Sequence, residues 1–272
     1  MTTSTVSNWQ TAMTWVKECV NIIWQQPFKW LAVAFMYLLV FLLLPARLPV
    51  VIGYALALLY PTFLALAVSL YREAHAKRET PLNVLIQTIK PTMMPLLLLG
   101  AICVAYSIVL AFFTQADSAA LKLLVDSKAP TEQILQTAFP LLLKAFMCLI
   151  PLMMATWFAP MLIAFQGLKV GQAIKSSIAG TIQGMLPMAL SWLIITLAMV
   201  ALMISAGIVF GLISTVLPKI GVLLTAVFLT FSFLFATALM LAFQYVTYRD
   251  ICTDLPIRTY TEKELLIELN DE

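Results

Sequence analysis

Long apolar stretches alternate with short mixed segments along the whole chain. A hydrocarbon core about 30 Å thick needs about 20 helical residues to cross it. Six stretches reach or approach that length, namely residues 28–44, 50–71, 91–114, 139–166, 186–216 and 220–248. The first is the shortest, and the last three exceed what an upright helix needs, which indicates tilting, kinking or projection beyond the membrane. The pattern predicts six membrane-spanning helices.

Three shorter segments alternate apolar and polar residues at helical spacing, and each precedes a predicted span. They are residues 7–26, 81–90 and 170–185. In the first, Trp9, Val16 and Trp24 share an apolar face, and Lys17 lies on the opposite face. We expect amphipathic helices that lie in the headgroup region, where they brace the bundle or, alternatively, sense or bind lipid.

The chain has the pattern of a threefold internal repeat. Lys17, Trp24 and Gln25 match the third segment at a constant offset of 158 residues, and the mid-span prolines precede the later amphipathic segments at similar distances. Each unit is an in-plane helix followed by a transmembrane hairpin, over residues 7–71, 80–166 and 168–248. Chance similarity between short apolar segments is the alternative interpretation.

Composition supports this reading and excludes several classes of protein. Hydrophobic residues make up 62% of the 272 residues, charged residues only 11%, and mean hydropathy is +0.98. Soluble domains have roughly 45–50% apolar and about 25% charged residues. A water-soluble enzyme and a disordered protein are therefore excluded, and a net charge of +3 is too small to suggest nucleic-acid binding. The fold class expected is an all-α, polytopic transmembrane bundle whose main partner is the lipid bilayer.

The distribution of Lys and Arg predicts the orientation. If the N-terminus is cytoplasmic, eleven of these residues lie inside and five outside. The positive-inside rule then places both termini in the cytoplasm, as an even number of spans requires. We expect a multi-pass protein of the bacterial inner membrane.

The sequence contains no recognisable arrangement of catalytic residues. All thirteen Asp and Glu residues fall outside the predicted spans, and the single histidine, His75, lies in a charged loop. An acid inside the membrane would be typical of a proton relay or an ion-coupled carrier. No nucleophile elbow, metal-binding pair or phosphate-binding loop occurs. We therefore expect no catalytic residues, no metal site and no cofactor.

A few residues inside the spans are candidates for contact with a solute or lipid. Pro61, Pro151 and Pro160 each free a backbone carbonyl, and broken helices can build binding sites at mid-membrane, although ordinary kinks are the alternative. Apart from Lys29 at the start of the first span, Lys144 is the one charge within a span; it either snorkels to the outer interface or contacts an anionic headgroup or solute.

Three further segments carry weaker predictions. Gly207 and Gly211 form a GxxxG pattern that favours close helix packing, within the bundle or between subunits. Residues 115–135 are expected to form a large outer loop with some helical content. The tail, residues 249–272, has a net charge of −4 and a capping-box pattern. It is either simply solvated or docks a basic cytoplasmic partner.

Short interfacial motifs resemble those of a known group of proteins. Gln25-Gln26-Pro27-Phe28-Lys29-Trp30 opens the first span, Ala159-Pro160 precedes the third unit, and Tyr248-Arg249-Asp250 closes the last span. From about residue 9 to residue 250 the chain resembles uncharacterised six-helix bacterial inner-membrane proteins, similar in layout to YciC-type proteins and to the membrane domain of some glycerophosphodiester phosphodiesterases. The resemblance implies a helical inner-membrane protein without established catalytic residues.

These observations lead to one functional hypothesis and one rival. We expect a non-enzymatic accessory or scaffold protein in membrane or envelope organisation that interacts with lipid. The rival is a transporter or channel for an apolar or lipid-like solute, built around the kinked second and fourth spans with Lys144 at its mouth.

Overall fold

The computed structural model describes residues 7–78 and 80–253, and every regular element in them is helical. The expected all-α class is confirmed. The elements are α1 (Asn8–Gln25), α2 (Pro27–Leu38), the π-helical turn η1 (Leu39–Leu43), α3 (Val50–His75), α4 (Leu82–Ile89), the 3₁₀ turn η2 (Lys90–Thr92), α5 (Met93–Asp126), α6 (Thr131–Thr156), α7 (Ala159–Gln166), α8 (Val170–Gln183), α9 (Met185–Val216) and α10 (Pro218–Cys252).

Five helical stretches are long and apolar enough to cross a membrane, and a bent pair raises the number to six if it forms one span. That pair is α1 with α2–η1, which meet at 102°. The bend lies at Gln26, whose φ of −145° and ψ of 66° are not helical. A residue before proline is pushed away from the helical region, and Pro27 begins α2. The helices indicate a membrane-embedded protein; the count of six spans and the threefold repeat stay predictions.

Most helix boundaries match the predicted spans to within a few residues. The prediction of a large outer loop over residues 115–135 was wrong. Residues 115–126 continue α5, α6 begins at Thr131, and only residues 127–130 form the turn. The run Ala119-Ala120-Leu121-Lys122-Leu123-Leu124 consists of strong helix formers, so the helix extends until Lys128 adopts a positive φ of 54°. Similarly, Arg249–Cys252, assigned to the tail, extend α10.

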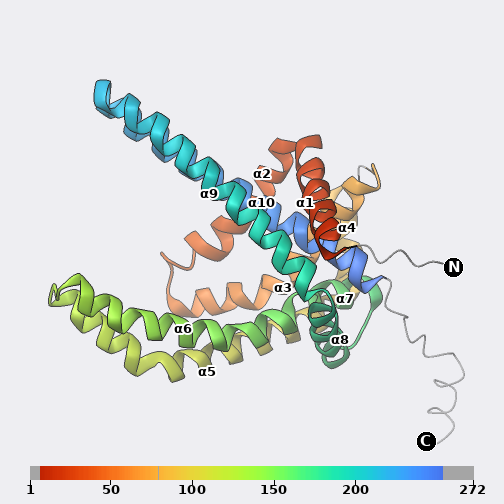
Figure 1. Cartoon of the computed structure of the whole chain (residues 1–272). Helices are drawn as coiled ribbons and strands as arrows, with labels where there is room; N and C mark the ends of the chain where they lie inside the picture. Colours follow the sequence, from red (N-terminus) through yellow and green to blue (C-terminus); the bar gives the residue numbers. More distant parts are fainter. Residues whose placement is uncertain (1–6, 79, 254–272) are drawn as a thin grey trace, which may run out of the picture.

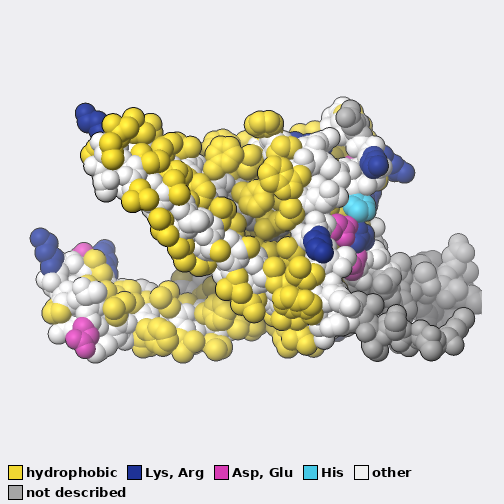
Figure 2. Space-filling model, turned by 45° about the horizontal axis from the view of Figure 1, so that its top comes forward, with side chains coloured by type: hydrophobic (Ala, Val, Ile, Leu, Met, Phe, Trp, Pro, Cys, Tyr) yellow, Lys and Arg dark blue, Asp and Glu magenta, His cyan; other side chains and the backbone are white. Residues whose placement is uncertain are grey.

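Long hairpins diverge from a common base (Figure 1). One arm is α5 with α6 and another is α9 with α10, and their tips point to the same side of the molecule. Figure 2 shows hydrophobic side chains over both arms, with charged side chains at the tips and around the base. At 1.5 Å per residue, the 32-residue α9 is about 48 Å long, longer than the bilayer core. The arms are thus long enough to cross while tilted away from each other.

The base is built around the last third of α10, whose residues from Thr237 to Tyr248 are buried with the exception of Met240. A helix that is buried on all sides must be surrounded by other elements. Here α1, α2, α3, α8 and α9 contact it. Phe243 is the centre of this packing, since the rings of three tryptophans lie within 6.4 Å of it; they are Trp15, Trp157 and Trp192.

The faces that α1 and α8 bury overlap only in part with the apolar faces that we expected. In α1, the buried residues are Ala12, Trp15, Cys19, Ile22 and Ile23, whereas Trp9 and Trp24 are exposed and Val16 is half-buried. In α8 the buried face is made of small residues; it consists of Val170, Ala173, Ser177 and Gly180. Small side chains let helices approach closely, so α8 turns this face to the protein interior and leaves Ile182 exposed.

Close helix packing occurs at a glycine that the sequence analysis did not select. A Cβ atom on Gly100 of α5 would overlap the carbonyl oxygen of Leu58 in α3 and lie 2.9 Å from its carbonyl carbon. By contrast, nothing lies within 4 Å of a Cβ built on Gly207 or Gly211. The GxxxG face of α9 is therefore open with respect to the described residues, 7–78 and 80–253, and its role in packing between subunits stays a prediction.

Replacing Gly100 with valine should lower the thermal midpoint of the purified protein. The added side chain has to displace backbone, and overpacking costs about 1–3 kcal/mol. Gly211→Ala is the matched control, since its Cβ enters open space and alanine favours the helix by about 0.5–1 kcal/mol. Equal losses of thermal midpoint in both variants, measured in the same detergent, would contradict the assigned α3–α5 contact.

Candidate functional site

Charged and polar side chains meet where α1, α3 and α10 converge, in a cluster that we call the polar junction: Trp15, Glu18, His75, Arg249 and Asp250. Arg249 makes a two-pronged hydrogen bond to Glu18, with Nη2 to Oε2 at 3.0 Å and Nη1 to Oε1. Its Nε and Nη2 also bond Asp250 Oδ1 at 2.8 and 2.7 Å. Asp250 in turn accepts a hydrogen bond from Trp15 Nε1 at 2.7 Å. The junction thus ties the first helix to the end of the last.

His75 completes the polar junction from the end of α3. Its Nδ1 lies 3.5 Å from Glu18 Oε1, its Nε2 lies 3.4 Å from Arg249 Nη1, and its ring packs 5.9 Å from that of Tyr245. The sequence analysis treated His75 as a solvated loop residue. The sequence places Glu18, His75 and Arg249 at the same membrane face, because each borders a predicted span. It does not reveal which helices are lateral neighbours, so the contact between these side chains was not predictable.

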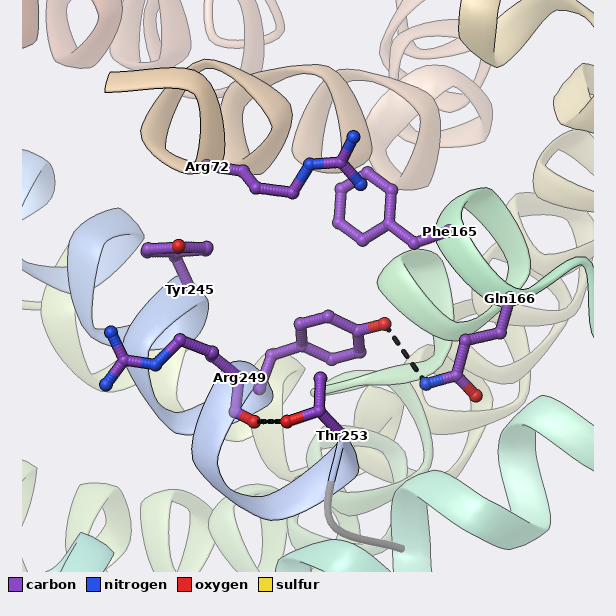
Figure 3. A pocket seen from close by; sticks show the side chains of 7 residues that line it. Arg72, Phe165, Gln166, Tyr245, Arg249 and Thr253 are labelled. Carbon is purple, nitrogen blue, oxygen red and sulfur yellow. Dashed lines mark hydrogen bonds between the residues drawn. The ribbon is translucent and has the colours of Figure 1, made fainter. Parts of the chain in front are cut away.

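A hollow of about 280 Å³ lies beside the junction. Figure 3 shows its walls: Arg72 from α3, Phe165 and Gln166 from α7, and Tyr245, Tyr248 and Arg249 from α10, with Thr253 just beyond. The Arg72 guanidinium lies 4.8 Å above the Phe165 ring, and Gln166 Nε2 donates to the Tyr248 hydroxyl at 3.2 Å.

The charges around this hollow balance each other. Arg249 is paired with Glu18 and Asp250, and Arg72 lies 3.6 Å from Glu73. No group of three metal-ligating side chains occurs within residues 7–78 and 80–253. The arrangement is suited to holding helix ends together, and the side chains that line the hollow include no serine or cysteine nucleophile.

The four candidate contact residues lie on three different helices and differ in exposure. Pro61 in α3 and Pro160 in α7 are buried, whereas Pro151 on α6 is exposed. Lys144 Nζ pairs with Asp117 Oδ2 at 2.8 Å, across the α5–α6 hairpin. Lys144 is therefore paired with a carboxylate on the α5–α6 arm.

The break at Pro160 is closed by a hydroxyl from α8. Ser177 Oγ accepts a hydrogen bond from the Phe158 amide at 3.0 Å and donates to the Met154 carbonyl at 2.7 Å. Groups that a helix break leaves unpaired are tolerated in a membrane only when protein satisfies them. Here the break is used for packing rather than for exposing backbone to a ligand.

A larger hollow of about 560 Å³, which we call the lateral groove, is lined by α1 and α2 on one side and by the α9–α10 arm on the other. Twelve of its thirteen lining residues are apolar, and the exception is Ser232. Sequence reasoning missed it, since its walls come from four helices of two different predicted units.

Comparison with known proteins adds no assignment: no protein-family model, curated protein or solved structure matches this chain. The resemblance to YciC-type proteins therefore stays a prediction.

Removing the charge of Glu18 should destabilise the base of the molecule. Glu18→Gln keeps the shape but gives Arg249, 32% exposed, a neutral amide with one acceptor oxygen in place of a carboxylate with two. Hydrogen bonds to charged groups contribute about 1.5–3 kcal/mol. Asp117→Asn is the control, because the exposed pair with Lys144 is worth about 0.2–1 kcal/mol. Thermal unfolding should rank Glu18→Gln well below Asp117→Asn; the reverse order would contradict the junction's role.

Proposed function

We propose that the protein is a non-enzymatic accessory or scaffold protein of the inner membrane, which organises the lipid or protein around it through its arms. The observation that carries this proposal is the exposure of the arms. The most apolar stretch of the α6–α7 segment has no buried residue, and only 6% of that of α9 is buried. Apolar surface of this extent requires a cover, and lipid or a membrane partner supplies it.

The amphipathic helices support contact with lipid as well as bracing. Each leaves large apolar side chains exposed on the outside of the base, namely Trp9, Trp24, Leu82, Val84, Ile86 and Ile182. Tryptophan is enriched at membrane interfaces because its ring is amphipathic. These helices brace the base with one face and offer the other to the headgroup region.

A transporter of an apolar or lipid-like solute is the second candidate, and the lateral groove favours it. The groove is apolar and within the size range of small-molecule sites, about 300–1,000 Å³. Against it, none of the candidate contact residues Pro61, Pro151, Pro160 and Lys144 is among the residues that line this groove. We therefore keep transport as the alternative.

The acidic segment proposed to dock a partner lies, from residue 254 onward, outside the described residues.

Purification in lipid nanodiscs with mass spectrometry of the bound material tests the proposal. We expect retained bilayer lipid and, after cross-linking in cells, a stoichiometric membrane partner attached through the arms. Saturable flux of a lipid-like solute into vesicles containing the protein would contradict the accessory role and support transport.

Reporter fusions should place the polar junction in the cytoplasm. A phosphatase that is active only outside the inner membrane should be active when inserted at Lys128 in the α5–α6 turn and inactive when fused after Glu272. A fluorescent protein that folds only in the cytoplasm should give the opposite result. Activity of the phosphatase at both sites would contradict the proposed orientation.

A further inference from the structure

The lateral groove has the length of one bilayer leaflet. Its α9 wall runs from Met199 to Phe210, and its α10 wall runs from Leu224 to Phe235. Eleven residue steps at 1.5 Å each give about 16 Å along both helices. Half of a hydrocarbon core about 30 Å thick is about 15 Å. Because α9 begins and α10 ends at the base, the groove extends from the base toward the tips over that distance.

The groove carries one hydroxyl that has no partner. Ser232 is 5% exposed, lines the groove, and makes no hydrogen bond within the described part of the chain. The four threonines of α10 all donate to a carbonyl four residues earlier, each at 2.7–2.9 Å. Ser232 lies one turn from Phe235, at the end of the groove nearest the base. It is thus available to donate to an acceptor in the groove.

The other lining residues disfavour a helix as the occupant. Helices associate in membranes through small residues that let backbones approach. This groove is walled by bulky side chains instead: Ile23, Trp24, Leu31, Met199, Leu202, Phe210, Leu224, Val227, Phe228, Phe231 and Phe235, with Pro27 beside them. None of the described residues that line it is charged, which disfavours entry of a headgroup. A flexible hydrocarbon chain matches such a surface.

We propose that the lateral groove binds one acyl chain of a membrane lipid from the leaflet nearest the polar junction. The chain lies along the α9–α10 arm, and its ester carbonyl accepts a hydrogen bond from Ser232. The headgroup then lies toward the α1–α2 bend, outside the groove. This inference rests on the proposed lipid-contacting function and adds a defined site and ligand class to it.

Photo-cross-linking in nanodiscs tests the site with phosphatidylethanolamine that carries a diazirine on one acyl chain. Peptide mapping should find labelling concentrated at Leu202, Val227 and Phe231. The exposed residues Leu142 and Phe146 of α6 serve as the reference for transient contact with bulk lipid. Labelling of the groove no stronger than that of α6 would overturn the proposal.

Variants provide the second part of the test. Val227→Trp fills the groove and should reduce its labelling about tenfold, the effect of losing 1.4 kcal/mol of binding. Val222→Trp, at an exposed position of the same helix outside the groove, should leave it unchanged. Ser232→Ala should reduce it by about three- to fivefold, as expected for one hydrogen bond. No decrease in labelling with Val227→Trp would contradict the proposal.

The two proposals fail in different ways. If the groove binds no lipid chain, nanodisc incorporation and the labelling of α6 persist. If the proposed function fails, vesicle flux is observed whatever the groove binds. Cross-links from groove residues to a second copy or to another protein, instead of lipid, would also overturn the acyl-chain site.

Discussion

The last third of α10 has to be enclosed, and much of the architecture follows from that constraint. Residues from Thr237 to Tyr248 are buried almost throughout, and Phe243 packs against tryptophans from three other segments of the chain. Enclosing a helix on all sides uses α1, α2, α3, α8 and α9 at one end of the molecule. The Glu18–Arg249–Asp250 network then ties the first helix to the last at the same end.

Because most helices pack together at the base, no other helix of the described residues covers the outer surfaces of the two arms. α5 with α6 and α9 with α10 extend from it as separate hairpins whose outer surfaces are apolar (Figures 1 and 2). In water such surfaces would associate, whereas in a bilayer lipid tails cover them without cost. The base is held together by its own contacts, and the arms are open to their surroundings. We find this arrangement more compatible with the proposed accessory role than with a catalytic or conducting role, which would need a closed core.

Sequence patterns predicted the positions and ends of several helices, because these depend on the length of apolar runs and on local helix propensity. The ends of α3 and α9 were predicted to within four residues, because apolar runs end where charged residues or prolines begin. The face that α1 buries was not predictable, since both Trp15 and Trp24 are apolar, and Trp15 is covered by contacts with Phe243 and Asp250, which lie far away in the sequence. The polar junction and the lateral groove depend on lateral neighbours far apart in the sequence. Extension of α5 to Asp126 was missed because a moderately polar segment was taken for a loop.

The most direct test of the account is the accessibility of spin labels on the arms to oxygen dissolved in lipid. Single cysteines at Phe112 and Leu142 on one arm and at Leu197 and Val209 on the other would be labelled in a chain otherwise free of cysteine, and reconstituted in bilayers. All four side chains are exposed. The account predicts high accessibility to oxygen and low accessibility to a water-soluble relaxation agent at all four positions. Shielding of either arm from both reagents would mean that the arms close into a compact bundle, and would contradict the splayed architecture.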